Sequence, residues 1–185
     1  MNENAALFFL DRHVDSHIKE KKAFIEYGSK QKFITYADLY EQSSKLRHFF
    51  SKFKINREDR VIILMQDVIS YPIIFWGCLK SGVVPVLLNT LLSSEVVNDI
   101  INNSRAKAVF ISSGLLSFFE NSVKKNVNIK HIIEVGAKKS NYINFEEEIQ
   151  KCSFKDTIQC SKDEIAFWLY SSGSTGQPKG VKHVH

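Results

Sequence analysis

Short apolar runs alternate with amphipathic segments through the middle of this 185-residue chain. The predicted order is a strand at 60–65, a helix at 70–80 ended by Gly82, a strand at 83–88, a helix at 93–103 and a strand at 107–111. Strands that are apolar along their whole length, with helices between them, are typical of a parallel sheet covered on both faces. We therefore predict an α/β fold built from βαβ layers, with helices on both faces of a parallel sheet.

The flanking regions contain further periodic segments. Residues 4–18 carry apolar residues at helical spacing, residues 23–27 and 32–35 are β-prone runs that suit a hairpin, and Thr35 can cap a helix that runs from 36 to about 53. Later we expect a helix at 115–126, a strand at 131–135, a short turn or helix at 144–149 and a strand at 165–170. The predicted parts are 1–55 (helix, hairpin, helix), 56–170 (parallel βαβ sheet) and 170–185 (loop and following strand).

The composition is that of a globular domain, with 44% hydrophobic and 24% charged residues. The net charge of +5 is spread over small clusters, and most of the 14 Phe lie within apolar runs, so we expect no nucleic-acid partner. The three cysteines form no Cys-x-x-Cys pair, which argues against a disulfide framework and fits a cytoplasmic protein. No apolar stretch reaches the about 20 residues that cross a bilayer, so we expect no membrane partner.

Residues 170–181 read Tyr-Ser-Ser-Gly-Ser-Thr-Gly-Gln-Pro-Lys-Gly-Val and directly follow a predicted strand. Glycines let backbone N–H groups approach an anion closely, the hydroxyls add donors, and the lysine places a compact charge near the outer phosphates. The candidate phosphate-binding residues are Ser171, Ser172, Gly173, Ser174, Thr175, Gly176, Lys179 and Gly180. The segment therefore predicts a polyphosphate-binding loop at the carboxyl end of a strand, where open α/β sheets bind ligands.

This loop differs from a Walker A loop. A Walker A lysine follows Gly and precedes Ser or Thr, whereas Pro178 and Gly180 flank Lys179. Residues 181–185 alternate in type and predict a strand, not the helix that follows a Walker A turn. A flexible Gly/Ser linker is the alternative, but the Pro-Lys-Gly sequence and the preceding strand argue against it.

The loop fills every position of the signature motif of the adenylate-forming enzymes, so the chain resembles that family of acyl- and aryl-CoA ligases, luciferase and peptide synthetase adenylation domains. The resemblance covers nearly the whole chain and includes Arg60-Val61-Ile62-Ile63-Leu64 upstream. Three stretches look most like benzoate- and hydroxybenzoate-CoA ligases: residues 9–13, residues 82–92 with Gly-Val-Val-Pro-Val and Asn-Thr-Leu-Leu, and residues 167–172.

The resemblance implies a two-step reaction, in which a carboxylate attacks the α-phosphate of MgATP and the thiol of coenzyme A then takes the acyl group. It implies ATP, Mg²⁺ and coenzyme A as cofactors and a carboxylic acid, aromatic by subfamily, as substrate. Ser171 to Gly176 would supply donors, Lys179 would pair with pyrophosphate, and Gly180 would be a turn residue.

The family's later elements, which include its adenine loop, its ribose aspartate and its C-terminal lysine, do not occur in these residues. We therefore expect an N-terminal fragment of an ATP-dependent acid–CoA ligase that is inactive alone, has no complete catalytic set, and relies on residues beyond it for Mg²⁺ and coenzyme A. The alternatives are the start of an amino-acid or fatty-acid adenylating enzyme, or a non-catalytic phosphate-binding or interaction module that self-associates through exposed sheet edges.

Other residues suggest weaker sites. His13 and His17 are spaced i, i+4, which would place them on one face of a helix, but no third metal ligand is evident, so we expect no metal site. His183 and His185 alternate along the last predicted strand and are expected to share a face, where they could ligate a metal or orient substrate. We expect them to support ligand-binding residues or to have a structural role. We expect Cys78 to be a core residue and Asp67 to be a polar residue at a strand end.

Overall fold

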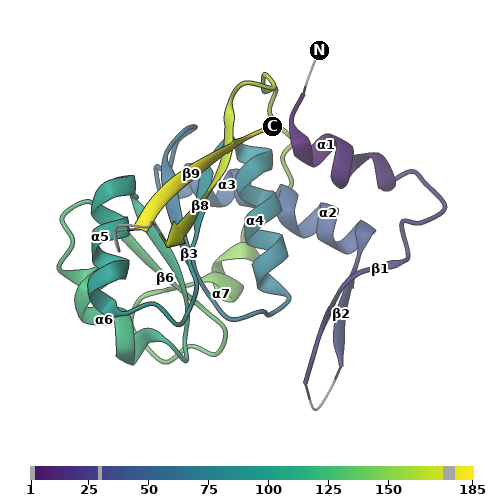
Figure 1. Cartoon of the computed structure of the whole chain (residues 1–185). Coiled ribbons are helices and arrows are strands. Elements are labelled where there is room, and N and C mark those ends of the chain that lie inside the picture. The colour runs from purple at the N-terminus through teal and green to yellow at the C-terminus, as the bar shows by residue number, and fades with distance from the viewer. Residues whose placement is uncertain (1–2, 29–30, 173–177) are drawn as a thin grey trace.

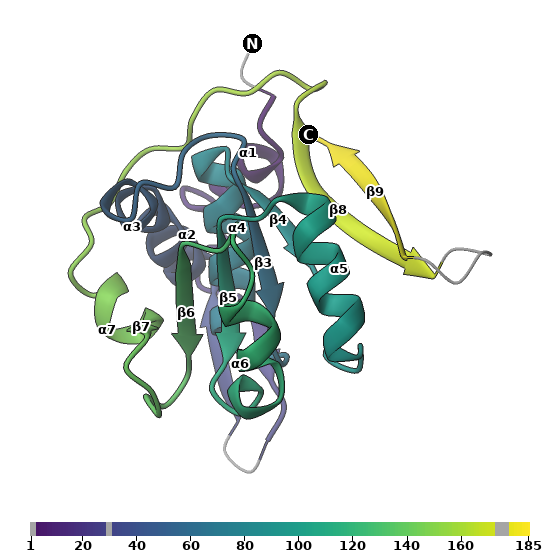
Figure 2. The same ribbon diagram turned by 90° about the vertical axis from the view of Figure 1, so that its left-hand side faces the viewer.

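The computed structural model describes residues 3–28, 31–172 and 178–185. Figure 1 shows the whole chain, and its main sheet has seven strands in the order β7-β6-β5-β3-β4-β8-β9, all labelled in Figure 2. These strands are β3 (Arg60–Leu64), β4 (Val84–Leu87), β5 (Ala108–Ser112), β6 (His131–Val135), β7 (Ile143–Asn144), β8 (Ile165–Ser172) and β9 (Pro178–Val184). Neighbouring strands are parallel except for β8 and β9, which pair antiparallel. The predicted α/β fold with a parallel sheet is confirmed.

Helices cover both faces of this sheet (Figure 2). One face carries α2 (Tyr36–Ser44), α3 (Leu46–Lys52) and α4 (Ser70–Ser81), and the opposite face carries α5 (Ser94–Ser104) and α6 (Leu116–Lys124). The short helices are α1 (Ala5–Phe9), which packs on α4, the 3-10 helix η1 (Asp11–His13) and α7 (Phe145–Ile149), which packs against β6 and α3. Because both faces are covered, the strands are apolar along their whole length.

The side chains of β3 alternate between two hydrophobic cores, one on each face of the sheet. Val61 and Ile63 belong to the core under α2, α3 and α4, whereas Ile62 and Leu64 belong to the core under α5 and α6. All four side chains are fully buried. Successive side chains of a strand point to opposite faces, so one apolar run supplies two separate cores.

Local signals start or end three helices, and the predicted roles of Thr35 and Gly82 are confirmed. Thr35 caps α2 in a capping box with Asp38, and Ser93 caps α5 by accepting a hydrogen bond from the N–H of Val96. Gly82 ends α4 in the left-handed region, with φ of 68°. The left-handed backbone favours glycine here, and a Cβ would also lie 2.3 Å from Cδ1 of Ile158, which would have to move.

Two predicted helices differ from the structure. The predicted helix over residues 4–18 is wrong beyond Phe9, where η1 and a series of turns replace it. Asp11 instead accepts hydrogen bonds from the buried ammonium of Lys80, at 2.7 Å, and from the hydroxyl of Thr157. These tertiary contacts outweigh the local helical periodicity.

The predicted helix over residues 36–53 is divided at Lys45 into α2 and α3. The hydroxyl of the buried Ser43 donates to the carbonyl of Tyr40 just before the division. A serine that bonds back to the preceding turn competes with the helical backbone and bends it.

The predicted hairpin is confirmed as β1 (Lys22–Glu26) and β2 (Lys32–Thr35), which form a separate two-stranded sheet and project from the body (Figure 1). Within the described residues, no helix is long and apolar enough to cross a membrane.

Candidate functional site

Strand β8 delivers the glycine loop to the carboxyl end of the parallel sheet. β8 runs parallel to β4, with Leu87 beside Leu169, and the chain returns along β8 as the antiparallel edge strand β9. The predicted strands before and after the glycine loop are confirmed. Of the candidate phosphate-binding residues, Gly173, Ser174, Thr175 and Gly176 lie outside the described residues.

The two ends of the loop place Ser171 and Lys179 directly opposite each other, and Ser172 opposite Pro178. Paired residues of an antiparallel ladder project to the same face, so the hydroxyl of Ser171 and the ammonium of Lys179 lie on one face of the β8–β9 pair. Lys179 is exposed and makes no ion pair with any residue in the described part of the chain. Its positive charge is therefore available to an anion at this end of the sheet.

Gly180 is not the turn residue that we expected. It lies within β9, opposite Tyr170, and its backbone does not adopt a positive φ. A Cβ at this position would lie 3.1 Å from Cζ of the Tyr170 ring. The phenol of Tyr170 is in turn held by α5, because its hydroxyl donates to Oδ1 of Asn103 at 2.6 Å. Glycine at this position lets the aromatic ring pack closely on the backbone of β9, and a larger residue would require the ring to shift.

The histidines that the sequence singled out contact neighbouring residues. His13 ends η1 and packs its ring edge-on against Tyr36, while His17 lies in a turn, so the predicted shared helix face is absent. His183 stacks on Phe167, with ring centroids 4.5 Å apart, whereas Nδ1 of His185 accepts the N–H of Ala5 at the start of α1. Both of the last two histidines thus have structural contacts.

The described residues contain no group of three His, Cys, Asp or Glu side chains that could hold a metal ion. Cys78 is fully buried in the core, as expected, and burial raises the pKa of its thiol well above the usual value. A thiol in this environment stays protonated and is not a nucleophile.

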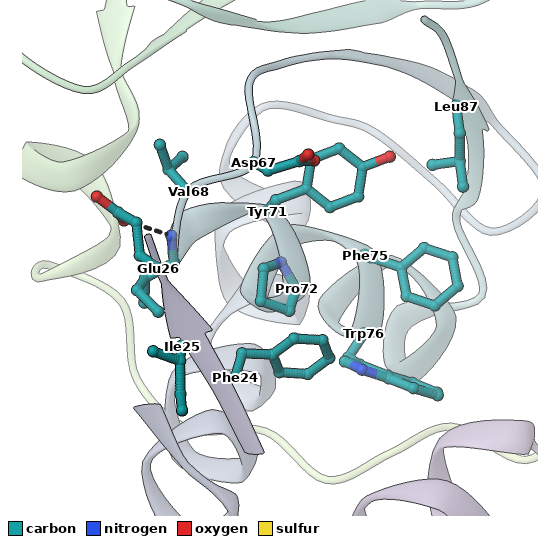
Figure 3. Close-up of a pocket in the computed structure, with 11 residues that line it drawn as sticks. Phe24, Ile25, Glu26, Asp67, Val68, Tyr71, Pro72, Phe75, Trp76 and Leu87 are labelled. Atoms are coloured by element: carbon teal, nitrogen blue, oxygen red, sulfur yellow. Dashed lines mark hydrogen bonds between the residues drawn. The ribbon is translucent and has the colours of Figure 1, made fainter. Parts of the chain in front are cut away.

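A cavity that the sequence did not predict lies between the hairpin and α4 (Figure 3). Its volume is about 450 Å³, and it is bounded by β1, the segment after β3, the first half of α4 and the end of β4. Aromatic side chains dominate its wall, among them Phe24, Tyr71, Phe75 and Trp76. Phe24 and Ile25 leave a large part of their surface exposed, at 43% and 52%. The only sequence signal was the apolar character of β1, which by itself predicts no particular partner.

One hydrogen bond fixes the hairpin beside the cavity. The carboxylate of Glu26 accepts the N–H of Ile69 at 2.9 Å, just before α4 begins (Figure 3). The same carboxylate pairs with Lys32 at 3.4 Å. On the other side of the cavity, burial raises the pKa of the Tyr71 phenol, and the negative charge of Asp67 raises it further. Asp67 therefore lies close enough to Tyr71 for their charges to interact.

Comparison with known families and curated proteins gives consistent matches. The family model described as AMP-binding enzyme matches residues 10–185. The 4-hydroxybenzoate–CoA/benzoate–CoA ligase of Rhodopseudomonas palustris is 34% identical over 188 residues, which cover 98% of this chain and 33% of that protein. The benzoate–CoA ligase of Thauera aromatica is 34% identical over 128 residues, which cover 69% of this chain and 24% of that protein. The chain thus spans at most about a third of the length of these relatives.

Solved structures agree with this match. The anthranilate CoA ligase AuaEII, determined in complex with anthranoyl-AMP, has a TM-score of 0.88 at 22% identity, over 100% of this chain and 35% of that chain. At this identity the likeness concerns the fold. A benzoate CoA ligase from Burkholderia xenovorans has a TM-score of 0.84 at 27% identity, over 98% of this chain and 34% of that chain.

Proposed function

Because this chain belongs to the AMP-binding enzyme family, we propose that it forms part of an ATP-dependent ligase that joins an aromatic carboxylic acid to coenzyme A. Support for an aromatic acid as substrate comes from the two benzoate–CoA ligases that match 98% and 69% of this chain. The proposal concerns the complete ligase, since these residues correspond to about a third of such a relative.

The proposed reaction has two steps. A carboxylate oxygen attacks the α-phosphorus of ATP, the bond to the bridging oxygen breaks, and pyrophosphate leaves with the electron pair. The coenzyme A thiolate then attacks the carbonyl carbon of the acyl-adenylate and AMP leaves. In the first step, negative charge accumulates on the leaving pyrophosphate, so prearranged donors and a positive charge at the β- and γ-phosphates lower the barrier.

The placement of Lys179 carries this proposal. Its ammonium faces the same side as the hydroxyl of Ser171, at the carboxyl end of β8, and no described carboxylate neutralises it. We assign Lys179 to the outer phosphates, and Ser171, Ser172 and the Gly173–Gly176 segment to donors around them. Gly180 contributes by letting Tyr170 pack closely against β9, next to the paired residues Ser171 and Lys179.

Mg²⁺, when bound, would offset the negative charge of the ATP phosphates. The described residues offer no cluster of ligands for it, so we assign neither Mg²⁺ nor coenzyme A to particular side chains of this chain.

The proposed phosphate site can be tested by titrating the chain with tripolyphosphate. Lys179→Gln is expected to weaken binding about tenfold or more, because it removes a charge-assisted contact. Lys182→Gln is the matched control, since Lys182 lies on the same strand but near the ring of Trp168 on the opposite face. Equal affinity in Lys179→Gln and the unaltered chain would refute the assignment.

A further inference from the structure

The aromatic cavity beside α4 is not suited to the carboxylate substrate. None of its eleven lining residues, all of them described, is Lys, Arg or His, and two of them, Glu26 and Asp67, are acidic. A bound carboxylate would lie among aromatic rings near negative charge, without a cation to pair with. The lining therefore offers no counter-charge to the carboxylate of the proposed substrate.

The two acidic residues are not equivalent. Glu26 is already engaged, because it accepts the N–H of Ile69 and pairs with Lys32. Asp67 makes no hydrogen bond or ion pair with any other described residue, yet its charge acts on the Tyr71 phenol. Figure 3 shows its carboxylate beside Tyr71 at the edge of the cavity. Asp67 is thus a free negative charge next to an aromatic wall.

An aromatic wall and a free carboxylate together favour an organic cation. The faces of Phe, Tyr and Trp rings attract ammonium groups, and a nearby carboxylate adds direct charge pairing. A volume of about 450 Å³ lies within the usual range for small-molecule sites. We propose that this cavity binds a small aromatic amine, with its ring between Phe24, Phe75 and Trp76 and its ammonium at Asp67. None of the lining residues belongs to the phosphate-binding segment 170–181.

The charge preference is the first test. Binding of 2-phenylethylamine and 3-phenylpropanoate to the chain would be compared by calorimetry or ligand-observed NMR. The amine is expected to bind about tenfold more tightly. This is the size expected when the ammonium of one ligand attracts Asp67 and the carboxylate of the other repels it at a partly exposed site. Equal binding of the two ligands, tighter binding of the acid, or no binding of the amine would overturn the proposal.

Two variants locate the site. Asp67→Asn is expected to reduce the amine preference to about twofold, whereas Glu95→Gln, which removes an exposed carboxylate on α5, should leave it unchanged. Phe24→Ala truncates a half-exposed side chain and should weaken amine binding several-fold while the fold is retained. Unchanged amine affinity in both Asp67→Asn and Phe24→Ala would show that the amine binds elsewhere.

Discussion

The ring of Tyr170 lies so close to Gly180 that a Cβ on residue 180 would approach the ring to 3.1 Å. The two residues face each other across β8 and β9, at the base of the glycine loop. Because the Tyr170 hydroxyl donates to Asn103, the ring cannot move away without losing a hydrogen bond to α5. The paired strands β8 and β9 are thus connected to α5 through Tyr170.

We predict that Gly180→Ala destabilises the chain by about 1–3 kcal/mol, the usual cost of overpacking a closely packed position. Urea unfolding would measure this change. In a Tyr170→Ala background the same substitution should cost much less, because the obstructing ring is gone. Equal costs in the two backgrounds would show that the Tyr170 contact is not the cause.

The buried pair of Lys80 and Asp11 leads to a second prediction. The Lys80 side chain is 1% exposed, and Asp11 is its only carboxylate partner within 4.0 Å among the described residues. Asp11→Ala should cost about 3 kcal/mol or more, since it leaves a buried ammonium without its counter-charge. The double variant Asp11→Ala with Lys80→Met should be more stable than Asp11→Ala alone.

Lys52→Met is a suitable control for that series. Lys52 pairs with Glu148 near the surface, and exposed pairs contribute at most about 1 kcal/mol. If the Asp11 and Lys52 variants lose similar stability, the buried pair does not have the importance that we assign to it.

Much of this fold could be predicted because its signals are local. The strands of the main sheet are apolar throughout, and Thr35, Ser93 and Gly82 mark helix ends by chemistry that acts within a few residues. The early end of α1 could not be predicted, since it depends on Asp11 reaching Lys80 and Thr157, both far away in sequence.

Part of the candidate site could likewise be predicted from the sequence, and part could not. The glycine loop is a contiguous motif, so its residues could be selected from the sequence. The aromatic cavity brings together side chains of the hairpin, the segment after β3 and α4, which only the folded chain places side by side. The role of Gly180 could not be predicted either, because the Tyr170 ring that requires glycine lies on the neighbouring strand.

His185 is expected to make stability depend on pH. Burial lowers the pKa of its imidazole below the usual 6.5, although the nearby Glu164 partly opposes this shift. As the pH falls through 6.5, the unfolded chain takes up a proton that the folded chain does not, so stability decreases. Protonation also removes the acceptor for the Ala5 N–H.

Denaturant unfolding at pH 7 and pH 5.5 would measure this effect. His185→Ala should lose less stability between the two pH values than the unaltered chain, whereas removal of the exposed His17 should change nothing. A His185→Ala variant with an unaltered pH dependence would show that other groups control it.

The edge strand β9 predicts self-association. It ends the sheet, and Val181 and Val184 are 46% and 55% exposed. Unpaired edges with exposed apolar side chains bind other strands, and a charged residue on the edge discourages this. We expect sedimentation to detect dimers or larger species of the chain, and fewer of them in Val181→Lys. A strictly monomeric chain at high concentration would contradict this expectation.

The most direct test of the proposed function is carboxylate-dependent exchange between ATP and pyrophosphate, measured on the complete product of the gene that encodes these residues. A panel of benzoates, fatty acids and amino acids would be compared, with Lys179→Gln as the variant and Lys182→Gln as its control. We predict exchange that depends on a benzoate-like acid and falls at least tenfold in Lys179→Gln, since this variant removes a full positive charge from the pyrophosphate site. If no carboxylate of the panel supports exchange, or if Lys179→Gln exchanges as fast as the unaltered protein, the proposed function is contradicted.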